Sequence, residues 1–390
     1  MNRLAIFFVF VLSVITAKSQ SDTLVSLVCT SPGTEIYELE GHAAIHLRLD
    51  ADRDFVISYG QFDFNSPNFV YRFVSGQTDY HVALYPWSSF IYQYQYQGAE
   101  RTIIEHPIKL TGDEVLRLAA LLEENLRPEN REYRYNYVKD NCATRPLQMI
   151  ERTIGREIAL GPAPEPFCEG ATTFRDVMRY YHRDYPWYQF GIDICLGSGI
   201  DYPLSRREMA FAPTVLTFML TPEADSIVGE ARVYEPENVV TSLPTPWYLS
   251  PIFVCYVFFV IGLWVTIRQL RTGKQPRVFD TFYFGVKFLC GILVTFLIFV
   301  SVHEATSPNM LLMWLNPLAI IPCIFLWIKS AKKAVNCYHF CNFALVFAMC
   351  AVWPLQNQVA NAAFWPIIFT DLMRSGTHIY LFIKEKRDEK

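Results

Sequence analysis

The stretch GHAAIHLRLDADRDFVISYG (41–60) decides the fold of the N-terminal half of the chain. Residues 41–49 alternate small and apolar side chains, and residues 54–60 form a second run that contains apolar side chains. Because the turn-forming residues LDADRD lie between the two runs, the pattern predicts a β-hairpin. Side chains alternate across a strand, so His42 and His46 share one face of the first strand.

Helix signals follow this hairpin along the chain. Thr111 and Glu114 form a capping pattern before an amphipathic segment that extends to about Leu126. A strand-like REYRYNYV (131–138) then leads into DNCATRPLQMIER, which predicts a helix with Cys142 at its start. Strands interleaved with helices in this way predict an α+β domain. The run YQYQYQ within Tyr92–Gln97 alternates like an exposed aromatic strand.

Composition excludes a single soluble globule. Only 18% of the 390 residues are charged and the mean hydropathy is +0.16, whereas soluble domains average about 25% charged residues. Residues 1–246 carry a net charge of −11, and residues 247–390 carry +7 and most of the long apolar runs. The acidic N-terminal half shows no basic patch, so nucleic acid is excluded as a partner.

Five apolar stretches in the C-terminal half approach the ~20 residues that a membrane-spanning helix needs. They are Tyr248–Ile267, Phe279–Val302, Leu311–Ile328, Val335–Leu355 and Ala363–Ile383. Basic loops alternate with the segments EATSPN (304–309) and QNQVAN (356–361), which contain no Lys or Arg. By the positive-inside rule the basic loops and the C-terminus are cytoplasmic. The lipid bilayer is therefore an expected partner.

The N-terminus predicts export. Arg3 precedes an apolar stretch, and Ala17-Lys18-Ser19 offers small residues for cleavage before Gln20. We therefore expect a signal peptide over 1–19, a domain outside the cytoplasm over 20–246 and a transmembrane domain over 247–390. An uncleaved anchor helix is the alternative, and it leads to the same location for the following domain.

Cys142 is the candidate nucleophile. A helix N-terminus lowers the pKa of a thiol and supplies backbone N–H groups to an oxyanion. Such a thiol needs a nearby base, and His42 and His46 on the predicted strand are the best placed. An ordinary buried cysteine is the alternative interpretation, and we expect His46 to be a packing or hydrogen-bonding neighbour. No spacing of Cys and His residues predicts a zinc site, and no cofactor is expected.

Several blocks of this sequence resemble the Lnb-type lipoprotein N-acyltransferases of Bacteroides-like bacteria. These blocks are PGTEIYELEGHAAIHLRL (32–49), SYGQFDFNSPNFVYRFVSGQTDYHV (58–82), PENREYRYNYVKDNCATRP (128–146), TFRDVMRYYHRDYPWYQFGIDICLG (173–197) and HEATSPNMLLMWLNP (303–317). The resemblance implies a permuted papain-like (NlpC/P60-like) periplasmic domain followed by an all-α bundle of five transmembrane helices. It also implies location in the bacterial inner membrane.

The resemblance implies that Gly41-His42 and Asn141-Cys142 carry the catalytic pair, with Cys142 as nucleophile and His42 as base. The motif does not fix the polar residue that orients the histidine. Glu35, Asp140 and Asn141 are candidates, and Glu35 is the preferred one. Further candidates for substrate or oxyanion contacts are Asn141, Arg145, Tyr59 and Asp63, although a structural role is favoured for Arg145 and turn or surface roles are equally expected for Tyr59 and Asp63.

The implied reaction moves an acyl chain from a membrane phospholipid to the α-amino group of diacylglyceryl-cysteine on a diacylated lipoprotein, through a thioester on Cys142. A phospholipase or a cell-wall cysteine hydrolase with the same Cys/His pair is the alternative. A non-enzymatic envelope sensor is a third reading, which the short C-terminal tail disfavours.

Polar residues in the membrane half have two open interpretations. Asp371, Arg374 and His378 fall on one stripe of the last apolar stretch, where they either form an internal Asp371–Arg374 pair or bind a lipid headgroup. Asn309 and Asn316, together with His303, flank an outer loop and are candidates to line a lipid groove that faces outward.

Overall fold

The computed structural model describes residues 23–97, 100–238 and 242–389. The chain divides into two compact units. The first extends to Tyr181 and resumes over Pro203–Leu243, and the second comprises His182–Tyr202 and Pro244–Lys390. The expected signal peptide lies outside the described residues.

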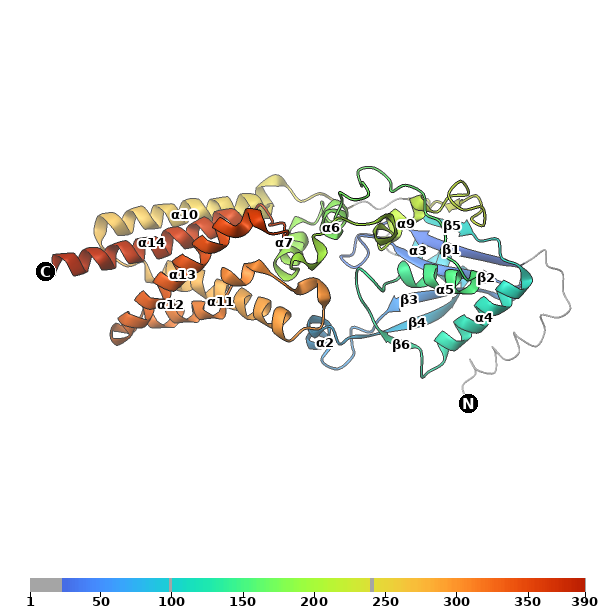
Figure 1. Ribbon diagram of the computed structural model, residues 1–390, viewed down its shortest axis with the longest axis horizontal. Coiled ribbons are helices and arrows are strands. Elements are labelled where there is room, and N and C mark those ends of the chain that lie inside the picture. The colour runs from blue at the N-terminus through green and yellow to red at the C-terminus, as the bar shows by residue number, and fades with distance from the viewer. Residues whose placement is uncertain (1–22, 98–99, 239–241, 390) are drawn as a thin grey trace. The chain divides into compact units, whose positions relative to one another are not determined.

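The first unit is built on a seven-stranded antiparallel sheet with the order β6-β4-β3-β2-β1-β5-β7 (Figure 1). Its strands are β1 (Leu24–Thr30), β2 (His42–Arg48), β3 (Asp54–Gln61), β4 (Asp79–Pro86), β5 (Ile103–Pro107), β6 (Glu132–Arg134) and β7 (Arg232–Tyr234). The predicted hairpin is confirmed as β2 and β3, which occupy the centre of the sheet.

The pairing of β2 with β3 stops short of the start of β2. The last pair joins Ala44 to Ser58, and the register of β3 against β4 shifts between Ser58 and Gln61. Such a bulge bends a strand away from its neighbour. The two central strands therefore separate just where His42 begins β2.

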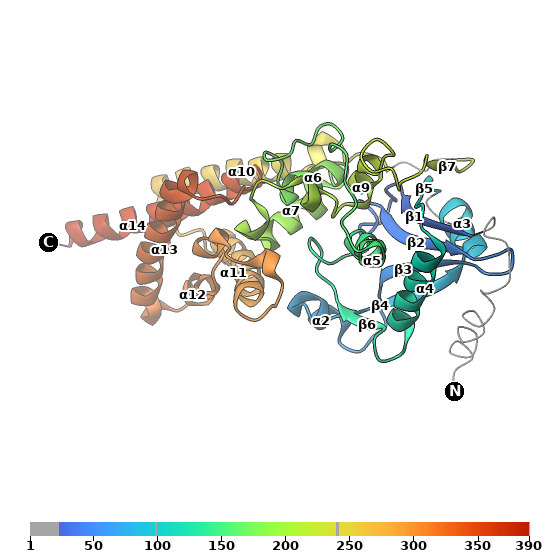
Figure 2. The ribbon, with the colours of Figure 1, turned by 45° about the vertical axis from the view of Figure 1, so that its right-hand side comes forward.

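Helices cover both faces of this sheet (Figure 2). On one face, Phe90 of α3 packs with Val28, Ala44 and Val56. On the other face lie α4, α5 and α9. The helices of this unit are α2 (Phe69–Ser75), α3 (Trp87–Tyr96), α4 (Gly112–Leu126), α5 (Thr144–Ile154), α6 (Phe174–Tyr181), α8 (Arg206–Met209) and α9 (Pro213–Met219).

Two local predictions in this unit had opposite outcomes. The capping box at Thr111 is confirmed, since its hydroxyl accepts from the Glu114 N–H and the Glu114 carboxylate accepts from the Thr111 N–H. The strand expected over Tyr92–Gln97 is wrong, because most of this run belongs to α3. There Phe90 and Tyr94, which are four residues apart, both face the sheet and override the alternating pattern.

The second unit is helical. Its α-helices are α7 (Pro186–Cys195), α10 (Pro251–Thr272), α11 (Arg277–Phe299), α12 (Ile320–Phe325), α13 (Lys332–Val352) and α14 (Phe364–Asp388). Its 3₁₀ helices are η1 (Ser198–Ile200), η2 (Trp247–Leu249), η3 (Glu304–Thr306), η4 (Met310–Met313), η5 (Pro317–Ala319), η6 (Lys329–Ala331) and η7 (Trp353–Leu355). Among the described residues, three helical segments are long and apolar enough to cross a membrane, namely Pro251–Thr272, Arg277–Phe299 and Lys329–Leu355.

The stretch Leu311–Ile328, expected as a continuous span, is broken into η4, η5 and α12. Pro317 begins η5 and explains the break after η4, because proline cannot continue a preceding helix. The last expected span forms the long helix α14, which packs along α10 and α13.

The polar stripe of α14 makes contacts between helices. Asp371 pairs with Lys287 of α11 at 2.5 Å and accepts from Asn342 of α13. Arg374 donates to both carboxylate oxygens of Asp280 at 2.8 and 2.9 Å. Of the two open interpretations, the internal Asp371–Arg374 pair is therefore wrong, and both charges are neutralised by α11. These contacts fix α14 against its neighbours, since an unpaired buried charge is costly.

We expect Lys287→Met to destabilise the bundle by about 3 kcal/mol, because it leaves the Asp371 carboxylate buried without its counter-ion. Adding Asp371→Asn should restore most of the loss. Lys332→Met, which breaks an exposed pair with Glu385, is the matched control and should change little. Unfolding of the detergent-solubilised chain measures all four proteins. A Lys287→Met chain as stable as the wild type would contradict this account of α14.

Candidate active site

Cys142 lies two residues before the start of α5, in a turn that Asn141 organises. The Asn141 amide donates to the carbonyls of Tyr137 and Phe211, both at 2.8 Å. Its Oδ1 accepts from the backbone N–H groups of Ala143 and Thr144 at 2.9 and 3.0 Å. All hydrogen-bonding positions of this buried side chain are used, so Asn141 fixes the backbone that carries Cys142.

The Cys142 thiol sits in the gap where β2 and β3 separate. The backbone N–H of Ala43 donates to its Sγ, and the Tyr135 hydroxyl approaches Sγ at 3.9 Å. A Cβ placed on Gly60 would lie 3.6 Å from the Cys142 Cβ, and Gly60 has a φ of +84°. The positive φ favours glycine at position 60, and a Cβ there would also approach Tyr135 Cε2 at 3.0 Å.

The pKa of the Cys142 thiol is raised, chiefly because burial disfavours the thiolate. The expectation that the helix N-terminus lowers this pKa is therefore wrong. Cys142 precedes the helix, and Asn141 already occupies two of the backbone N–H groups that would stabilise a thiolate. All ten cysteines, Cys142 included, are free thiols.

His42 begins β2, beside the Ala43 N–H that contacts the thiol. Gly41 has a φ of +82°, and a Cβ there would lie 2.3 Å from the Thr30 carbonyl oxygen, so the Gly41-His42 pair needs glycine. The imidazole is half-buried and stacks against Tyr94 of α3 with ring centroids 6.3 Å apart. Burial first, and then the positive charge of Arg101, lower its pKa to about 3. The ring is neutral at neutral pH.

Ser58 is the polar residue that contacts His42. Its hydroxyl lies 2.7 Å from His42 Nε2 and also accepts from Gln61 at 3.1 Å. Ser58 was not among the residues predicted from the sequence, although its position in the predicted hairpin was a signal. Ser58 pairs with Ala44, so its side chain shares a face with His42.

The three expected orienting residues lie elsewhere. Glu35 is exposed in the turn before β2. Asp140 accepts two hydrogen bonds from Arg145, at 2.6 and 2.7 Å, and Asn141 caps the turn of Cys142.

The remaining candidates have structural contacts. The Arg145 guanidinium, besides pairing with Asp140, stacks 3.5 Å from the ring centroid of Tyr133, which agrees with the structural role favoured for it. Tyr59 is completely buried. Asp63 is exposed and accepts from the Asn65 N–H at 2.8 Å in a turn.

His46 is a buried structural residue, as expected. Its ring contacts Glu105 at 2.6 Å and Asp54 at 2.5 Å, and it stacks on Trp87 with centroids 4.0 Å apart. Both ring nitrogens are therefore used away from Cys142. Across the part of the chain that the structure describes, no group of three His, Cys, Asp or Glu side chains could hold a metal ion.

Two further charged residues border the pair, and neither was foreseen. Glu40 is buried with a hydrogen bond to Tyr137, and burial raises its pKa to about 7. When ionised, its charge raises the pKa of Cys142. Arg101 is buried between Glu38 at 3.1 Å and the Tyr94 ring at 4.8 Å.

These surroundings specify a neutral thiol and a neutral imidazole at rest. A thiol with a raised pKa does not ionise by itself at neutral pH, and an imidazole with a lowered pKa retains a lone pair that can accept a proton. At neutral pH neither group carries a charge, so no thiolate–imidazolium pair is formed in advance.

Comparison with known families gives two matches on one chain. Residues 12–183 match the Lnb N-terminal periplasmic domain, and residues 244–386 match the Lnb transmembrane domain. The chain belongs to the Lnb family. This membership makes it a membrane protein with a periplasmic N-terminal domain and suggests an acyltransferase. No curated protein and no solved structure matches the chain.

The alkylation of Cys142 by iodoacetamide should report its raised pKa. Because the thiolate reacts, the rate should keep rising with pH and reach its midpoint above the ordinary value of 9.0. Peptide mass spectrometry between about pH 6 and about pH 11 follows the reaction, with the exposed Cys168 as an internal check on the reagent. A rate that levels off below about pH 7 would reveal a preformed thiolate and contradict the neutral pair.

Proposed function

We propose that this Lnb-family protein is a lipoprotein N-acyltransferase that uses Cys142 as its nucleophile. The observation that carries the proposal is the free Cys142 thiol, held against the backbone N–H of Ala43, the residue that directly follows His42. Family membership supports the acyl-transfer chemistry, and the membrane domain supports lipid-anchored substrates. The acyl donor is a membrane phospholipid, and the acceptor is the α-amino group of diacylglyceryl-cysteine on a lipoprotein.

In the first half-reaction, His42 accepts the Cys142 proton as Sγ attacks an ester carbonyl of the phospholipid. Ser58 accepts a hydrogen bond from His42 Nε2–H, which leaves Nδ1 as the base. A thioester bond forms, the ester C–O bond breaks, and His42 returns the proton to the departing lysophospholipid oxygen. Ser58 acts as a positioning residue, because it acts through His42.

In the second half-reaction, the α-amino nitrogen of the lipoprotein attacks the thioester carbonyl. An amide bond forms as the C–S bond breaks. His42 takes the proton that the amine loses, and Cys142 recovers a proton as the thiol. The product is an N-acylated lipoprotein, and neither half-reaction needs a cofactor.

The proposal includes a permuted papain-like arrangement of the first unit and five crossings by the second. The central strands that present His42 before the helix of Cys142 support the former. The alternation of basic and non-basic loops supports the latter, with the segment 311–328 and α14 as the crossings beyond the three long apolar helices. The C-terminus is then cytoplasmic and the first unit periplasmic, in the bacterial inner membrane, after a signal peptide over 1–19.

Mass spectrometry of the N-terminal peptide of a native lipoprotein tests the proposal in cells that lack this protein. We expect the N-acyl mass to return with the wild-type chain and to be absent with Cys142→Ala, because no thioester forms without Sγ. Cys168→Ala removes an exposed thiol and should behave as the wild type. A triacylated lipoprotein in every strain would overturn the proposal and favour a hydrolytic role for the Cys/His pair.

The same assay, followed over time, tests Ser58. We expect Ser58→Ala to slow transfer on the order of tenfold, or about 1.4 kcal/mol, because His42 loses its orienting partner. Its pH–rate profile should also shift. Ser75→Ala removes another buried hydroxyl, which donates to the Arg72 carbonyl, and should leave both rate and profile unchanged. Equal effects of the two variants would reduce Ser58 to a packing role.

A further inference from the structure

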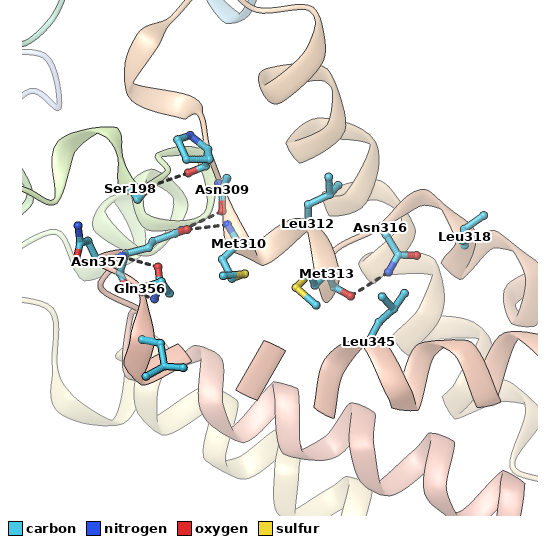
Figure 3. A pocket seen from close by; sticks show the side chains of 13 residues that line it. Ser198, Asn309, Met310, Leu312, Met313, Asn316, Leu318, Leu345, Gln356 and Asn357 are labelled. Atoms are coloured by element: carbon cyan, nitrogen blue, oxygen red, sulfur yellow. Dashed lines mark hydrogen bonds between the residues drawn. The ribbon is translucent and has the colours of Figure 1, made fainter. Parts of the chain in front are cut away.

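The second unit contains a cavity of about 660 Å³ that the chemistry of Cys142 leaves unexplained. Figure 3 shows side chains of η4 and α13 along it. Its apolar wall consists of Met310, Leu312, Met313, Leu318, Leu345 and Leu355. A volume within the usual 300–1,000 Å³ and an apolar wall are the properties of a ligand site.

One end of this cavity has a rim of uncharged polar groups. Asn309, Gln356, Asn357 and Gln358 contribute side-chain amides, and Ser198 contributes a hydroxyl. Gln358 links two loops, because it donates to Asn309 Oδ1 at 2.9 Å and accepts from the Met310 N–H at 2.8 Å. Gln358 and Asn309 are both more than nine-tenths buried, so the fold holds the amides of the rim in fixed positions (Figure 3).

The rim lies at the end of the bundle where the loops carry no basic residues. Leu345 lies about two turns before α13 ends at Val352, so the cavity follows the helix for roughly 10 Å. With the topology proposed above, this end faces the periplasm. The cavity then spans the depth at which acyl chains of the outer leaflet meet their glycerol esters.

Charge around the rim selects among lipids. None of the described residues that line the cavity has an ionisable side chain. The three segments that meet there, 182–202, 300–319 and 353–363, contain four carboxylates and a single arginine. Two of the carboxylates hold the second loop, since Asp193 accepts from Asn361 at 2.8 Å and Asp201 from the Val359 N–H at 3.4 Å. A phosphate favours Arg and Lys partners, whereas an amine is favoured beside carboxylates.

We propose that this cavity binds the diacylglyceryl anchor of the lipoprotein acceptor. The inference rests on the proposed function, and it assigns the two lipid substrates to different places. The acyl chains of the acceptor lie along the apolar wall of the second unit. The amide rim contacts the glycerol esters and the first peptide bonds, and the acidic surroundings favour the free α-amino group over a phosphate. The phospholipid donor binds elsewhere.

The test uses the full chain in lipid nanodiscs and does not require turnover. The probe is a synthetic S-diacylglyceryl-cysteinyl peptide with a free amine and a photoreactive diazirine in one acyl chain. Irradiation of the Cys142→Ala chain should label peptides that contain Met310–Leu318 and Leu345–Gln358. Unlabelled lipopeptide should compete at least tenfold better than phosphatidylglycerol of the same chain length.

Leu345→Trp and Met313→Trp fill the apolar part of the cavity and should each reduce labelling at least fivefold. Leu289→Trp places the same side chain on an exposed position of α11 and should have no effect. Thermal unfolding of each variant shows that the bundle is intact. If the tryptophan variants fold poorly, a second pair, Leu345→Ala and Met313→Ala, replaces them. These variants enlarge the cavity, and we expect the probe to label the same positions in them.

Three outcomes overturn the inference. They are labelling outside the cavity, equal competition by phosphatidylglycerol, and tryptophan variants that label as the wild type does.

The proposed function fails separately, through a Cys142→Ala chain that still restores N-acylation in cells. In chains that retain Cys142, the tryptophan variants should acylate Cys142 from phospholipid at a rate within about twofold of the wild-type rate. Transfer of the acyl group to the lipopeptide should fall at least tenfold. Loss of acylation itself would make the cavity the donor site and contradict the inference.

Discussion

The gap between β2 and β3 is the constraint on which the site depends. Antiparallel strands normally continue their hydrogen bonds to the end, but here the pairing stops at Ala44 and Ser58. The Ala43 N–H is left to contact Cys142. Two glycines make this possible, since Gly41 and Gly60 both adopt positive φ. The fold thereby brings a thiol from a helix turn to the start of the strand that carries His42.

Burial determines how this pair is able to react. It raises the pKa of Cys142 and lowers that of His42, so both groups are neutral at rest. A neutral thiol is protected from adventitious chemistry in an oxidising compartment. In the proposed mechanism, Cys142 attacks the substrate carbonyl while His42 accepts its proton. This arrangement agrees with a proposed enzyme that must wait for two membrane-anchored substrates in turn.

The sequence predicts what local periodicity controls and misses what depends on distant partners. The hairpin and the Thr111 capping box follow from neighbouring residues, and both are present. Ser58 lies within the predicted hairpin, yet its role depends on the register, which the loop sets. The strand expected over Tyr92–Gln97 failed because Phe90 and Tyr94 pack on the sheet as a helix. Asp371 and Arg374 could be recognised as costly, but their partners on α11 are about 90 residues away.

The most direct test of the account is the mass of the chain after incubation with a phospholipid that carries a single defined acyl chain. We expect one added acyl group, located on the peptide that contains Cys142 and removed by hydroxylamine, as a thioester would be. Release of lysophospholipid with no acyl group on Cys142 would contradict it.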